Sequence, residues 1–465
     1  MEFDKLKEEC GIFGVFGITP DAVSKTVLGL HALQHRGQEA AGIVSFDRTK
    51  FHIHKEKGLV NKVFNSQLLI NKLEGYSSIG HVRYSTMGDN IINNIQPLFA
   101  DFSFGGFSIA HNGNIVNADE LRSKLIKKGH LFQSTSDTET IIHLISISKK
   151  PSLISKICDS LNKIKGAYSL VMLVDNKLIG VRDPTGFRPL VLGKLGNSFI
   201  LSSESCALDI IDAKFIRDIE PGELITIDNN GPISIKPFKK VKQKFCVFEY
   251  IYFSRPDSTI EKINVYEVRK HIGAQLSKEA NISADMVIPV PDSGVPSAIG
   301  YSNESGIPFE LGIIRSHYIG RTFIEPTSDI RNLEVKLKHN VNKKLILGKR
   351  IILVDDSIVR GTTAKKLIQL IRDAGAKEIH LCISSPPVTH SCFYGIDTPI
   401  REELIASFNG TDKISKLLGV DSLTYISIKG LYKAIKKVEN ITPNLNFCDA
   451  CFTGKYPIKI PNYKE

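Results

Sequence analysis

The fold of this 465-residue chain is decided by one stretch, Lys349-Arg350-Ile351-Ile352-Leu353-Val354-Asp355-Asp356-Ser357-Ile358-Val359-Arg360-Gly361-Thr362-Thr363. Its apolar part, Ile351 to Val354, is typical of a parallel strand that is buried on both faces. Either of the two closing threonines can cap a helix, which Gly375 would end. Because Glu378 to Ser384 predicts another strand, the stretch indicates a βαβ unit.

Two carboxylates, Asp355 and Asp356, stand at the carboxyl end of the first of these strands. In open α/β sheets ligands bind at this end, where loop amides and a helix N-terminus favour phosphate. The carboxylates can accept hydrogen bonds from sugar hydroxyls or hold a divalent cation. The alternative is an acidic turn that only caps a helix, but the whole pattern favours a phosphoribosyl site.

Ile352 to Thr363 resembles the phosphoribosylpyrophosphate (PRPP) signature of type I phosphoribosyltransferases. The upstream strand and turn, Ile288 to Gly294, resembles the pyrophosphate loop of that family, although Pro-Asp-Ser-Gly is also ordinary turn chemistry. The resemblance implies that Mg²⁺ is linked to Ser293, Asp355 and Asp356. The PRPP-binding residues that it implies are Asp292, Ser293, Gly294, Asp355, Asp356, Ser357, Arg360, Gly361, Thr362 and Thr363.

Length and composition indicate a globular protein of two domains, with 42% apolar and 23% charged residues. No apolar run approaches the ~18 residues that a membrane span needs, and Met1 to Glu9 lacks the apolar core of a signal peptide. We therefore expect a cytoplasmic protein without a membrane partner. In such a protein the eight cysteines indicate thiols, metal binding or catalysis rather than a disulfide framework.

The net charge of +11 would suit a nucleic-acid partner. The basic residues are dispersed, however, and the densest clusters are Lys236 to Lys244 and Lys336 to Arg350. The first cluster resembles a solvated linker, and the second adjoins the predicted phosphate site. We therefore expect no nucleic-acid partner.

The first half of the chain predicts many short strands with helices between two sets of them, which indicates two packed sheets with helical cover. The expected helices begin at Asp21 or Ser24, at Asp137 and at Leu153. The expected strands are Cys10 to Gly17, Gly42 to Phe46, Phe51 to His54, Ser78 to Ser85, Phe107 to His111, the hairpin Tyr168 to Val174 and Leu178 to Val181 across Asp175 to Lys177, Leu190 to Leu192, Phe199 to Ser202 and Glu223 to Ile227.

A basic join, Lys236 to Lys244, is the candidate domain boundary. After it we expect a helix from Val265 to Leu276 and a strand from Met286 to Val290. Tyr318 to Asn340 is long, charged and without apolar periodicity, which predicts a mobile functional loop. The segment resembles one that closes over PRPP in the glutamine PRPP amidotransferases, so we expect a lid here.

Cys10 lies at the start of a glycine-rich strand, in Glu9-Cys10-Gly11-Ile12-Phe13-Gly14. This resembles the N-terminal nucleophile amidotransferases, whose precursor is cut immediately before the cysteine. A free α-amino group has a pKa of about 7.7–8.0, so part of it can act as base toward its own thiol at neutral pH. The alternative for Cys10 is a small core residue.

Other residues of the first half suit a glutamine site. Arg83 can pair with an α-carboxylate and Asp137 with an α-ammonium group. Asn112 and Gly113 supply a side-chain amide and a backbone N–H, the donors of an oxyanion hole. Singly these are a surface arginine, a helix-capping aspartate and an Asn-Gly turn. Together with Leu33 to Gly37, they resemble the class II glutamine amidotransferases, and that likeness adds Arg36 to the glutamine-binding residues.

Four further cysteines fit one purpose: Cys246, Cys392, Cys448 and Cys451. The C-x-x-C pair alone could bind zinc or exchange thiols. All four positions resemble the ligands of one [4Fe–4S] cluster in a subgroup of the glutamine PRPP amidotransferases. The remaining cysteines, Cys158, Cys206 and Cys382, lie in apolar segments and are expected in the core.

From Cys10 to Tyr456 the chain resembles the glutamine PRPP amidotransferase family, in its propeptide-bearing, iron–sulfur subgroup. The resemblance implies a propeptide, residues 1–9, and an α+β N-terminal nucleophile hydrolase domain of two packed sheets with helical layers, residues 10–240. An α/β type I phosphoribosyltransferase domain with a C-terminal cluster-binding segment, residues 241–465, would follow.

The implied reaction releases ammonia from glutamine at Cys10 and transfers it to PRPP, giving 5-phosphoribosylamine, glutamate and pyrophosphate. This is the first committed step of de novo purine (IMP) synthesis, and the family further implies a homotetramer and inhibition by purine nucleotides. Two rival functions are a glucosamine-6-phosphate synthase, which lacks a PRPP signature, and a PRPP-sensing regulator that binds nucleic acid. Neither rival explains Asp355 together with Cys10 and Arg83.

Overall fold

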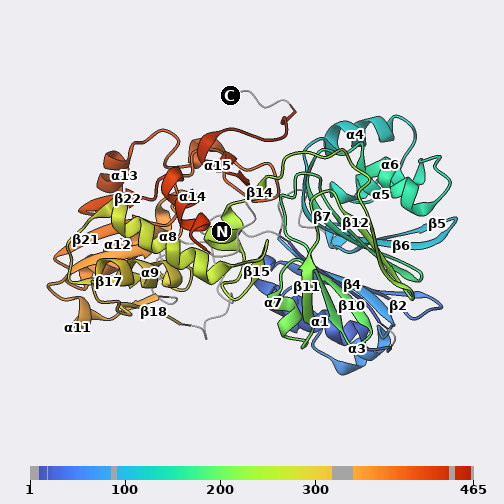
Figure 1. Ribbon diagram of the computed structural model, residues 1–465, viewed down its shortest axis with the longest axis horizontal. Coiled ribbons are helices and arrows are strands. Elements are labelled where there is room, and N and C mark those ends of the chain that lie inside the picture. Colours follow the sequence, from blue (N-terminus) through green and yellow to red (C-terminus); the bar gives the residue numbers. More distant parts are fainter. Residues whose placement is uncertain (1–9, 18, 85–91, 317–338, 439–445, 462–465) are drawn as a thin grey trace.

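The computed structural model describes residues 10–17, 19–84, 92–316, 339–438 and 446–461. Figure 1 shows two halves side by side, one with the blue and green elements and the other with the yellow to red ones. In the described part of the chain, no helix is long and apolar enough to cross a membrane.

A seven-stranded sheet in the first half has the order β11-β9-β10-β1-β4-β2-β3. Its central strand β1 is buried along its whole length and pairs antiparallel with β10 and β4. The strands are β1 (Gly11–Phe16), β2 (Ala40–Phe46), β3 (Phe51–Lys57), β4 (Ser77–Arg83), β9 (Val191–Leu195), β10 (Ser198–Ser202) and β11 (Lys214–Asp218).

A six-stranded sheet with the order β13-β12-β8-β7-β6-β5 faces the first one. Ile12, Val44 and Val171 belong to the apolar layer between the two sheets. Gly14 permits their close approach, because a Cβ there would lie 2.7 Å from the Val171 side chain. The strands are β5 (Leu98–Phe102), β6 (Gly105–Ile115), β7 (Gly166–Val174), β8 (Lys177–Arg182), β12 (Leu224–Asp228) and β13 (Gly231–Ile235).

Helices cover the outer face of each sheet, so the first half has the four layers that the sequence predicts. Leu30 of one helix packs with Phe13 outside the seven-stranded sheet, and Ile145 packs with Met172 outside the other. The helices are α1 (Ala22–Ala32), α2 (Val60–Val63), α3 (Gln67–Lys72) and α7 (Cys206–Asp209) on one side, and α4 (Ala118–Ile126), α5 (Thr138–Ser146) and α6 (Leu153–Leu161) on the other.

The second half contains a parallel sheet with the order β17-β20-β21-β22 and helices on its faces. The predicted βαβ unit is confirmed: β20 (Arg350–Asp355) leads through α12 (Thr362–Asp373) to β21 (Glu378–Ile383). The other elements are β17 (Met286–Pro289), β22 (Ser422–Tyr425), α8 (Val265–Ala280), α9 (Val295–Ser305), α11 (Lys343–Ile346), α13 (Thr411–Leu418) and α14 (Ile428–Lys436).

Short elements lie around the join of the two halves. Residues 237–244 carry no helix or strand, and they lead into β14 (Phe245–Cys246). This strand pairs in parallel with β23 (Phe447–Cys448), so the join meets a segment from near the end of the chain. The others are η1 (Gln34–Arg36), η2 (Ile92–Asn94), η3 (Glu249–Phe253), η4 (Arg401–Glu403), β15 (Thr259–Ile260), β16 (Ile263–Asn264), β18 (Ile313–Arg315), β19 (His339–Val341) and α15 (Ala450–Thr453).

Three sequence predictions need correction. The cap of α12 is Gly361, in the left-handed conformation with φ of 83°, rather than Thr362 or Thr363, because the loop must turn back sharply before the helix. The predicted loop from Tyr318 to Asn340 lies outside the described residues up to 338, whereas His339 and Asn340 belong to β19, which pairs with β18. Cys158 is half-buried rather than in the core.

Candidate active sites

The first site begins where two central strands of the seven-stranded sheet end. The β1–β4 register pairs Gly11 with Val82, which places Cys10 beside Arg83. The Cys10 Sγ donates a weak hydrogen bond to the Tyr84 carbonyl oxygen at 3.5 Å. Gly37 lies directly behind Arg83, because a Cβ at Gly37 would come within 2.7 Å of the Arg83 backbone N. The turn after α1 therefore fixes the strand that carries Arg83.

The opposite wall of this site is β6, which continues past the end of β5. On the edge that β5 leaves open, the His111 N–H donates to Gln96 Oε1 at 2.7 Å, and the Ile115 N–H donates to Asp137 Oδ2 at 2.9 Å. Strand alternation directs the Gly113 N–H to this same edge, between the other two. The Asn112 side-chain amide is fully buried and has no hydrogen-bond partner among the described residues. Two amide donors are thus placed where the sequence predicts an oxyanion hole.

One cation, Arg83, and two anions, Asp137 and Glu39, act on the thiol. Burial raises the pKa of the Cys10 thiol to about 11, and Arg83 opposes this rise while Asp137 and Glu39 add to it. Burial also acts to raise the pKa of Asp137, but His111 outweighs it and holds that pKa below its usual value. At neutral pH the thiol is therefore protonated and needs a base, and Asp137 is an anion. The arrangement suits an amino acid with its own two charges.

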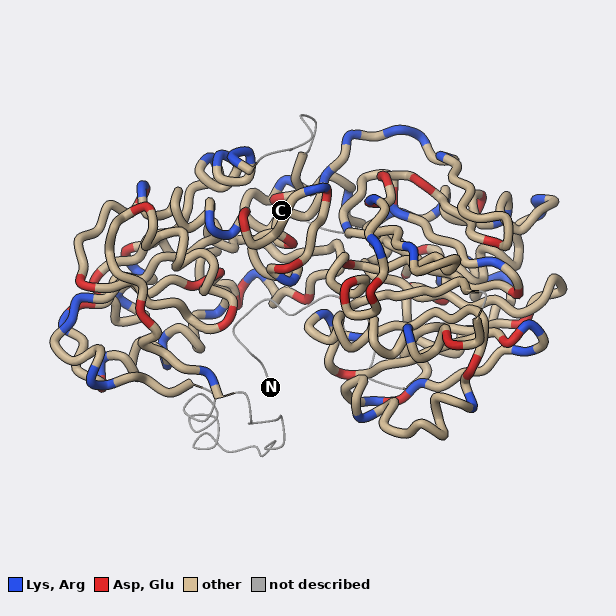
Figure 2. Tube along the Cα trace, turned by 60° about the horizontal axis from the view of Figure 1, so that its bottom comes forward, with Lys and Arg blue, Asp and Glu red and all other residues tan. Residues whose placement is uncertain are grey.

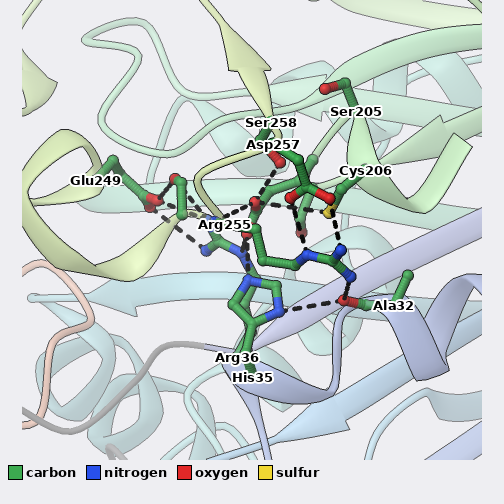
Figure 3. A network of polar contacts seen from close by, with 12 residues as sticks. Ala32, His35, Arg36, Ser205, Cys206, Glu249, Arg255, Asp257 and Ser258 are labelled. Atoms are coloured by element: carbon green, nitrogen blue, oxygen red, sulfur yellow. Dashed lines mark hydrogen bonds and ion pairs between the residues drawn. The ribbon is translucent and has the colours of Figure 1, made fainter. Parts of the chain in front are cut away.

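Arg36 has a different set of partners. Its guanidinium is buried and donates to the Glu204 and Glu249 carboxylates, the latter at 2.5 Å (Figure 3). Glu204 also accepts from Ser258, at 2.6 Å, and contacts His35, at 2.7 Å. This network joins the turn after α1 to the segment after the domain join. The glutamine-binding role of Arg36 stays a prediction.

The second site lies at the carboxyl ends of two adjacent parallel strands, β17 and β20. Gly294 packs directly against β20, because a Cβ there would lie 2.4 Å from the Val354 carbonyl oxygen. Asp355 and Asp356 are buried at the end of β20. The Asp356 N–H donates to Asp355 Oδ1 at 2.9 Å, and the Ser357 hydroxyl donates to Asp356 Oδ2 at 2.6 Å. The two loops predicted to bind PRPP are therefore adjacent.

The charged residues of the second site pair at its surface. Arg315 Nη1 lies 2.7 Å from Asp292 Oδ2, and Arg360 pairs with Glu403 at 2.5 Å. The two buried carboxylates with the nearby hydroxyls give an all-oxygen donor set, which is what Mg²⁺ prefers. The residues therefore fit the predicted metal. Gly361 is the cap of α12, so the N-terminus of this helix directly follows the loop after β20.

The four predicted cluster cysteines come together at one cavity of about 20 Å³, beside Arg188 and Tyr394. Cys246 and Cys448 are paired in the β14–β23 register. In the described ranges no three His, Cys, Asp or Glu side chains are close enough to hold one metal ion. Four thiols that line one cavity are a donor set that both zinc ions and iron–sulfur clusters use.

The comparisons with known proteins agree with this division of the chain. Residues 81–209 match a glutamine amidotransferase domain, and residues 259–386 match a phosphoribosyl transferase domain. The amidophosphoribosyltransferase of Rhizobium etli is 51% identical over 99% of this chain and 94% of its own length. That of Bacillus subtilis is 45% identical over 100% of this chain and 98% of its own. The chain belongs to the amidophosphoribosyltransferase family.

The fold agrees with this membership. The solved structure of glutamine PRPP amidotransferase from Bacillus subtilis, in complex with ADP and GMP, has a TM-score of 0.92 and 44% identity over 97% of this chain and 98% of its own. The family assigns an N-terminal nucleophile domain followed by a type I phosphoribosyltransferase domain. Its reaction moves ammonia from glutamine to PRPP and opens purine synthesis. A synthase without a PRPP domain is excluded by the match over residues 259–386.

Several residues of these amidophosphoribosyltransferase sites were missed by sequence reasoning. Gln96 bonds to β6, Glu204 and Glu249 hold Arg36, and Arg188 lines the cysteine cavity. One signal was available: Arg188 stands between Phe187 and Pro189, next to an apolar run, which is typical of a buried charge with a partner. The others have no local signal, because their partners are far away in the sequence.

Basic and acidic residues are intermixed over both halves of this family member (Figure 2). In this view Lys and Arg positions, in blue, are spread over both halves, and acidic positions, in red, lie among them. The described part of the backbone therefore shows no single basic stripe in this view.

Proposed function

We propose that Cys10 is the glutamine nucleophile and that it becomes the N-terminal residue through removal of residues 1–9. The observation that carries this proposal is the buried Asn112 amide next to the open edge at Gly113; this amide has no hydrogen-bond partner in the part of the chain that the structure describes. A buried unpaired amide costs free energy unless a ligand or an intermediate satisfies it. A glutamine carboxamide that becomes an oxyanion is such a group.

The proposed first half-reaction proceeds on this chain's own residues. The α-amine of Cys10 takes the thiol proton, and the sulfur attacks the carboxamide carbon of glutamine. The new oxyanion accepts hydrogen bonds from Asn112 Nδ2 and the Gly113 N–H, while Arg83 and Asp137 hold the α-carboxylate and α-ammonium groups. The C–N bond breaks, the amine proton passes to the leaving nitrogen, and ammonia and a γ-glutamyl thioester result. Water then releases glutamate.

The proposed second half-reaction takes place at β17 and β20. Asp355 and Asp356 accept hydrogen bonds from the ribose hydroxyls, Ser357 to Thr363 bind the 5′-phosphate, and Asp292 to Gly294 bind the pyrophosphate. When bound at Ser293, Asp355 and Asp356, Mg²⁺ supplies neutralisation of the pyrophosphate charge. The exposed ion pairs of Asp292 and Arg360 can open for substrate, since such pairs contribute only about 0–1 kcal/mol. Catalysis is then largely positioning.

We further propose that Cys246, Cys392, Cys448 and Cys451 hold one [4Fe–4S] cluster, which would join the linker, the second domain and the segment near the chain end. The domain bounds at residues 10–240 and 241–465, a homotetramer and a cytoplasmic location remain proposals of the same kind. Inhibition by purine nucleotides is also a proposal, and it is supported by the ADP and GMP in the Bacillus subtilis complex. The lid expected at Tyr318 to Asn340 lies outside the described residues up to position 338.

One preparation tests processing and cluster together. Anaerobically purified protein should have the intact mass of a chain that begins at Cys10, visible absorbance, and four irons per chain. Fully active protein that retains Met1 to Glu9 would overturn the processing proposal. Stoichiometric zinc without iron would overturn the cluster proposal.

A cysteine substitution provides the matched control for the cluster. Cys448→Ser should give colourless, poorly folded protein, because the four thiols join segments that are distant in sequence. Cys158→Ser, on the half-buried face of α6, should keep both colour and fold. A coloured Cys448→Ser protein with full iron content would remove Cys448 from the ligand set.

A further inference from the structure

The loop that carries one of the cavity cysteines, Cys392 to Gly395, also touches the strand that carries Gly113. Asn114 Nδ2 donates to the Phe393 carbonyl oxygen at 2.9 Å, across the boundary between the two halves. Gly395, with φ of 107°, lies so close that a Cβ there would come 3.0 Å from Gly113 Cα. The loop and the strand are therefore in direct backbone contact.

The other side of Gly113 is equally tight. A Cβ at Gly113 would lie 2.0 Å from the Ala167 carbonyl oxygen on β7. Gly113 is thus enclosed between a strand of its own half and a loop of the other half. Since β5 ends at the Leu98–Ile109 pair, no β5 strand supports β6 at this point. The Gly395 loop contacts β6 there.

The loop is held firmly enough to act as such a support. Arg188 donates to the Tyr394 carbonyl oxygen through Nε, at 3.0 Å, and through Nη2, at 2.5 Å. The Tyr394 ring stacks on Phe187 with a centroid distance of 4.4 Å, and its hydroxyl donates to the Ile458 carbonyl oxygen at 2.7 Å. The Tyr394 N–H in turn donates to Cys392 Sγ at 3.3 Å. Movement of the cysteine would therefore be transmitted to the loop backbone.

We propose that Asn114 and Gly395 are positioning residues for glutamine hydrolysis, which set the direction of the Gly113 N–H from across the boundary. This inference rests on the proposed oxyanion role of Gly113. Neither residue needs to touch glutamine. Their effect falls on the transition state, because only the oxyanion, and not the bound amino acid, depends on that N–H. Through Tyr394, the cysteine cavity becomes part of the support for the glutamine reaction.

Asn114→Ala tests the hydrogen-bonded contact. We expect the glutaminase kcat to fall roughly 10- to 100-fold, as for a misplaced catalytic group, with the glutamine KM within about twofold of the parent value. Synthesis from added ammonia and the iron content should be unchanged. Alkylation of Cys10 by iodoacetamide should keep its rate, because that displacement forms no oxyanion. If Asn114 had only a structural role, its loss would also change the glutamine KM and the rate of Cys10 alkylation.

Asn117→Ala is the matched control, because it lies three positions further along. Its side chain donates to the Lys163 carbonyl oxygen at 3.1 Å and accepts from the Lys165 N–H at 2.8 Å, all within the first half. It should lose at least as much thermal stability as Asn114→Ala and keep the parent kcat. Equal losses of kcat in the two variants would overturn the proposal.

Gly395→Ala tests the backbone contact, and Gly231→Ala controls for the strain of a positive φ. Gly231 has φ of 98°, yet a Cβ there meets nothing within 4 Å. We expect only Gly395→Ala to lower the glutaminase kcat, again at unchanged ammonia-dependent synthesis. If Gly395→Ala fails to fold, Asn114→Ala decides.

The outcomes separate this inference from the proposed function. If Cys10→Ala or Asn112→Ala keeps glutaminase activity, the proposed glutamine site is wrong. If both lose it while Asn114→Ala and Gly395→Ala keep the parent kcat, the site stands and only the positioning role is overturned.

Discussion

The two sites of this chain are built in opposite ways. The proposed glutamine site takes Arg83 and the residue before β1, Cys10, from one sheet, and Asn112 and Gly113 from the other sheet. Asp137 comes from the cap of the helix that covers this second sheet. The PRPP site uses two adjacent strands and the loops that directly follow them. A site of the first kind exists only after both sheets have packed, whereas one of the second kind needs only two neighbouring strands of one parallel sheet.

The charged residues of the two sites also differ, in how far they are exposed to solvent. Arg83 is buried and the Asp137 side chain is only 9% exposed, so their electrostatic effects on Cys10 are screened little by water. Asp292 and Arg360 form partly exposed ion pairs, which an anionic substrate can exchange at low cost. The glutamine site is therefore preorganised by the fold, and the PRPP site is prepared to rearrange. Mutations can test most directly whether the glutamine reaction and the PRPP reaction proceed independently of each other.

The largest effect should come from Cys10→Ala. Without its nucleophile, glutamine-dependent synthesis should be abolished, while synthesis from added ammonia should continue because PRPP binds in the other half. The measurement compares pyrophosphate release with each nitrogen source, and Cys158→Ala is the control. Equal loss of both activities in a folded variant would break the separation of the sites.

Asp356→Asn should act on both activities. Losing a carboxylate that is proposed to bind the ribose hydroxyls and Mg²⁺ should remove several kcal/mol of charge stabilisation, so both rates should fall roughly a hundredfold or more. Asp373→Asn, at the exposed end of α12, should leave both rates unchanged. A loss confined to the glutamine-dependent rate would contradict the assignment of Asp356.

Arg83→Ala should act on glutamine alone and less strongly. The lost charge-assisted bond to the α-carboxylate is worth about 1.5–3 kcal/mol, which raises the glutamine KM by roughly 10- to 150-fold. Steady-state kinetics with glutamine and with ammonia measure the change, and the exposed Arg48→Ala is the control. An unchanged glutamine KM would remove Arg83 from the site.

The smallest effect on chemistry should come from Glu204→Gln in the network of Figure 3. Burial acts to raise the pKa of Glu204, but Arg36 and His35 outweigh it and hold that pKa well below its usual value of 4.5. A carboxylate whose pKa is lower in the folded than in the unfolded protein contributes its full stabilisation above pH 4.5. This contribution is lost as the pH falls below 4.5. The ammonia-dependent rate at pH 7 should be retained, while the free energy of unfolding falls.

The pH dependence of Glu204→Gln provides the decisive measurement. The difference in stability from the parent should be constant between pH 6 and 8, and it should shrink by about 1.4 kcal/mol per pH unit below 4.5. Asp257→Asn breaks an exposed pair with Arg255 and should cost about 1 kcal/mol or less. A difference for Glu204→Gln that persists unchanged at pH 3.5 would show that its pairing does not stabilise the fold.

Sequence reasoning succeeded where structure follows from neighbouring residues. The buried run Ile351 to Val354 and the acids after it gave the correct strand, loop and helix, because all of them lie within one βαβ unit. The two-sheet architecture also followed from strand patterns. β13 was missed because Pro232 and exposed side chains hide its alternation, and the cap of α12 was wrong because the left-handed turn at Gly361 has no threonine signal.

The rest of the candidate sites depends on distance in space. Nothing near Gln96 in the sequence indicates that its amide binds β6, and nothing near Arg36 indicates the carboxylates of Glu204 and Glu249. The contact between Asn114 and Phe393 joins residues 279 positions apart. Such pairs follow from how two halves dock, which no local pattern encodes.

The pairing of β14 with β23 has a consequence for the order in which the protein is made. Cys246 and its partner Cys448 leave the ribosome about 200 residues apart, which at 5–20 residues per second is a delay of roughly 10 to 40 s. During that time the first half can fold, but β14 lacks its partner strand β23. A nascent chain interrupted before Phe447 would keep that edge open and display it to chaperones and proteases.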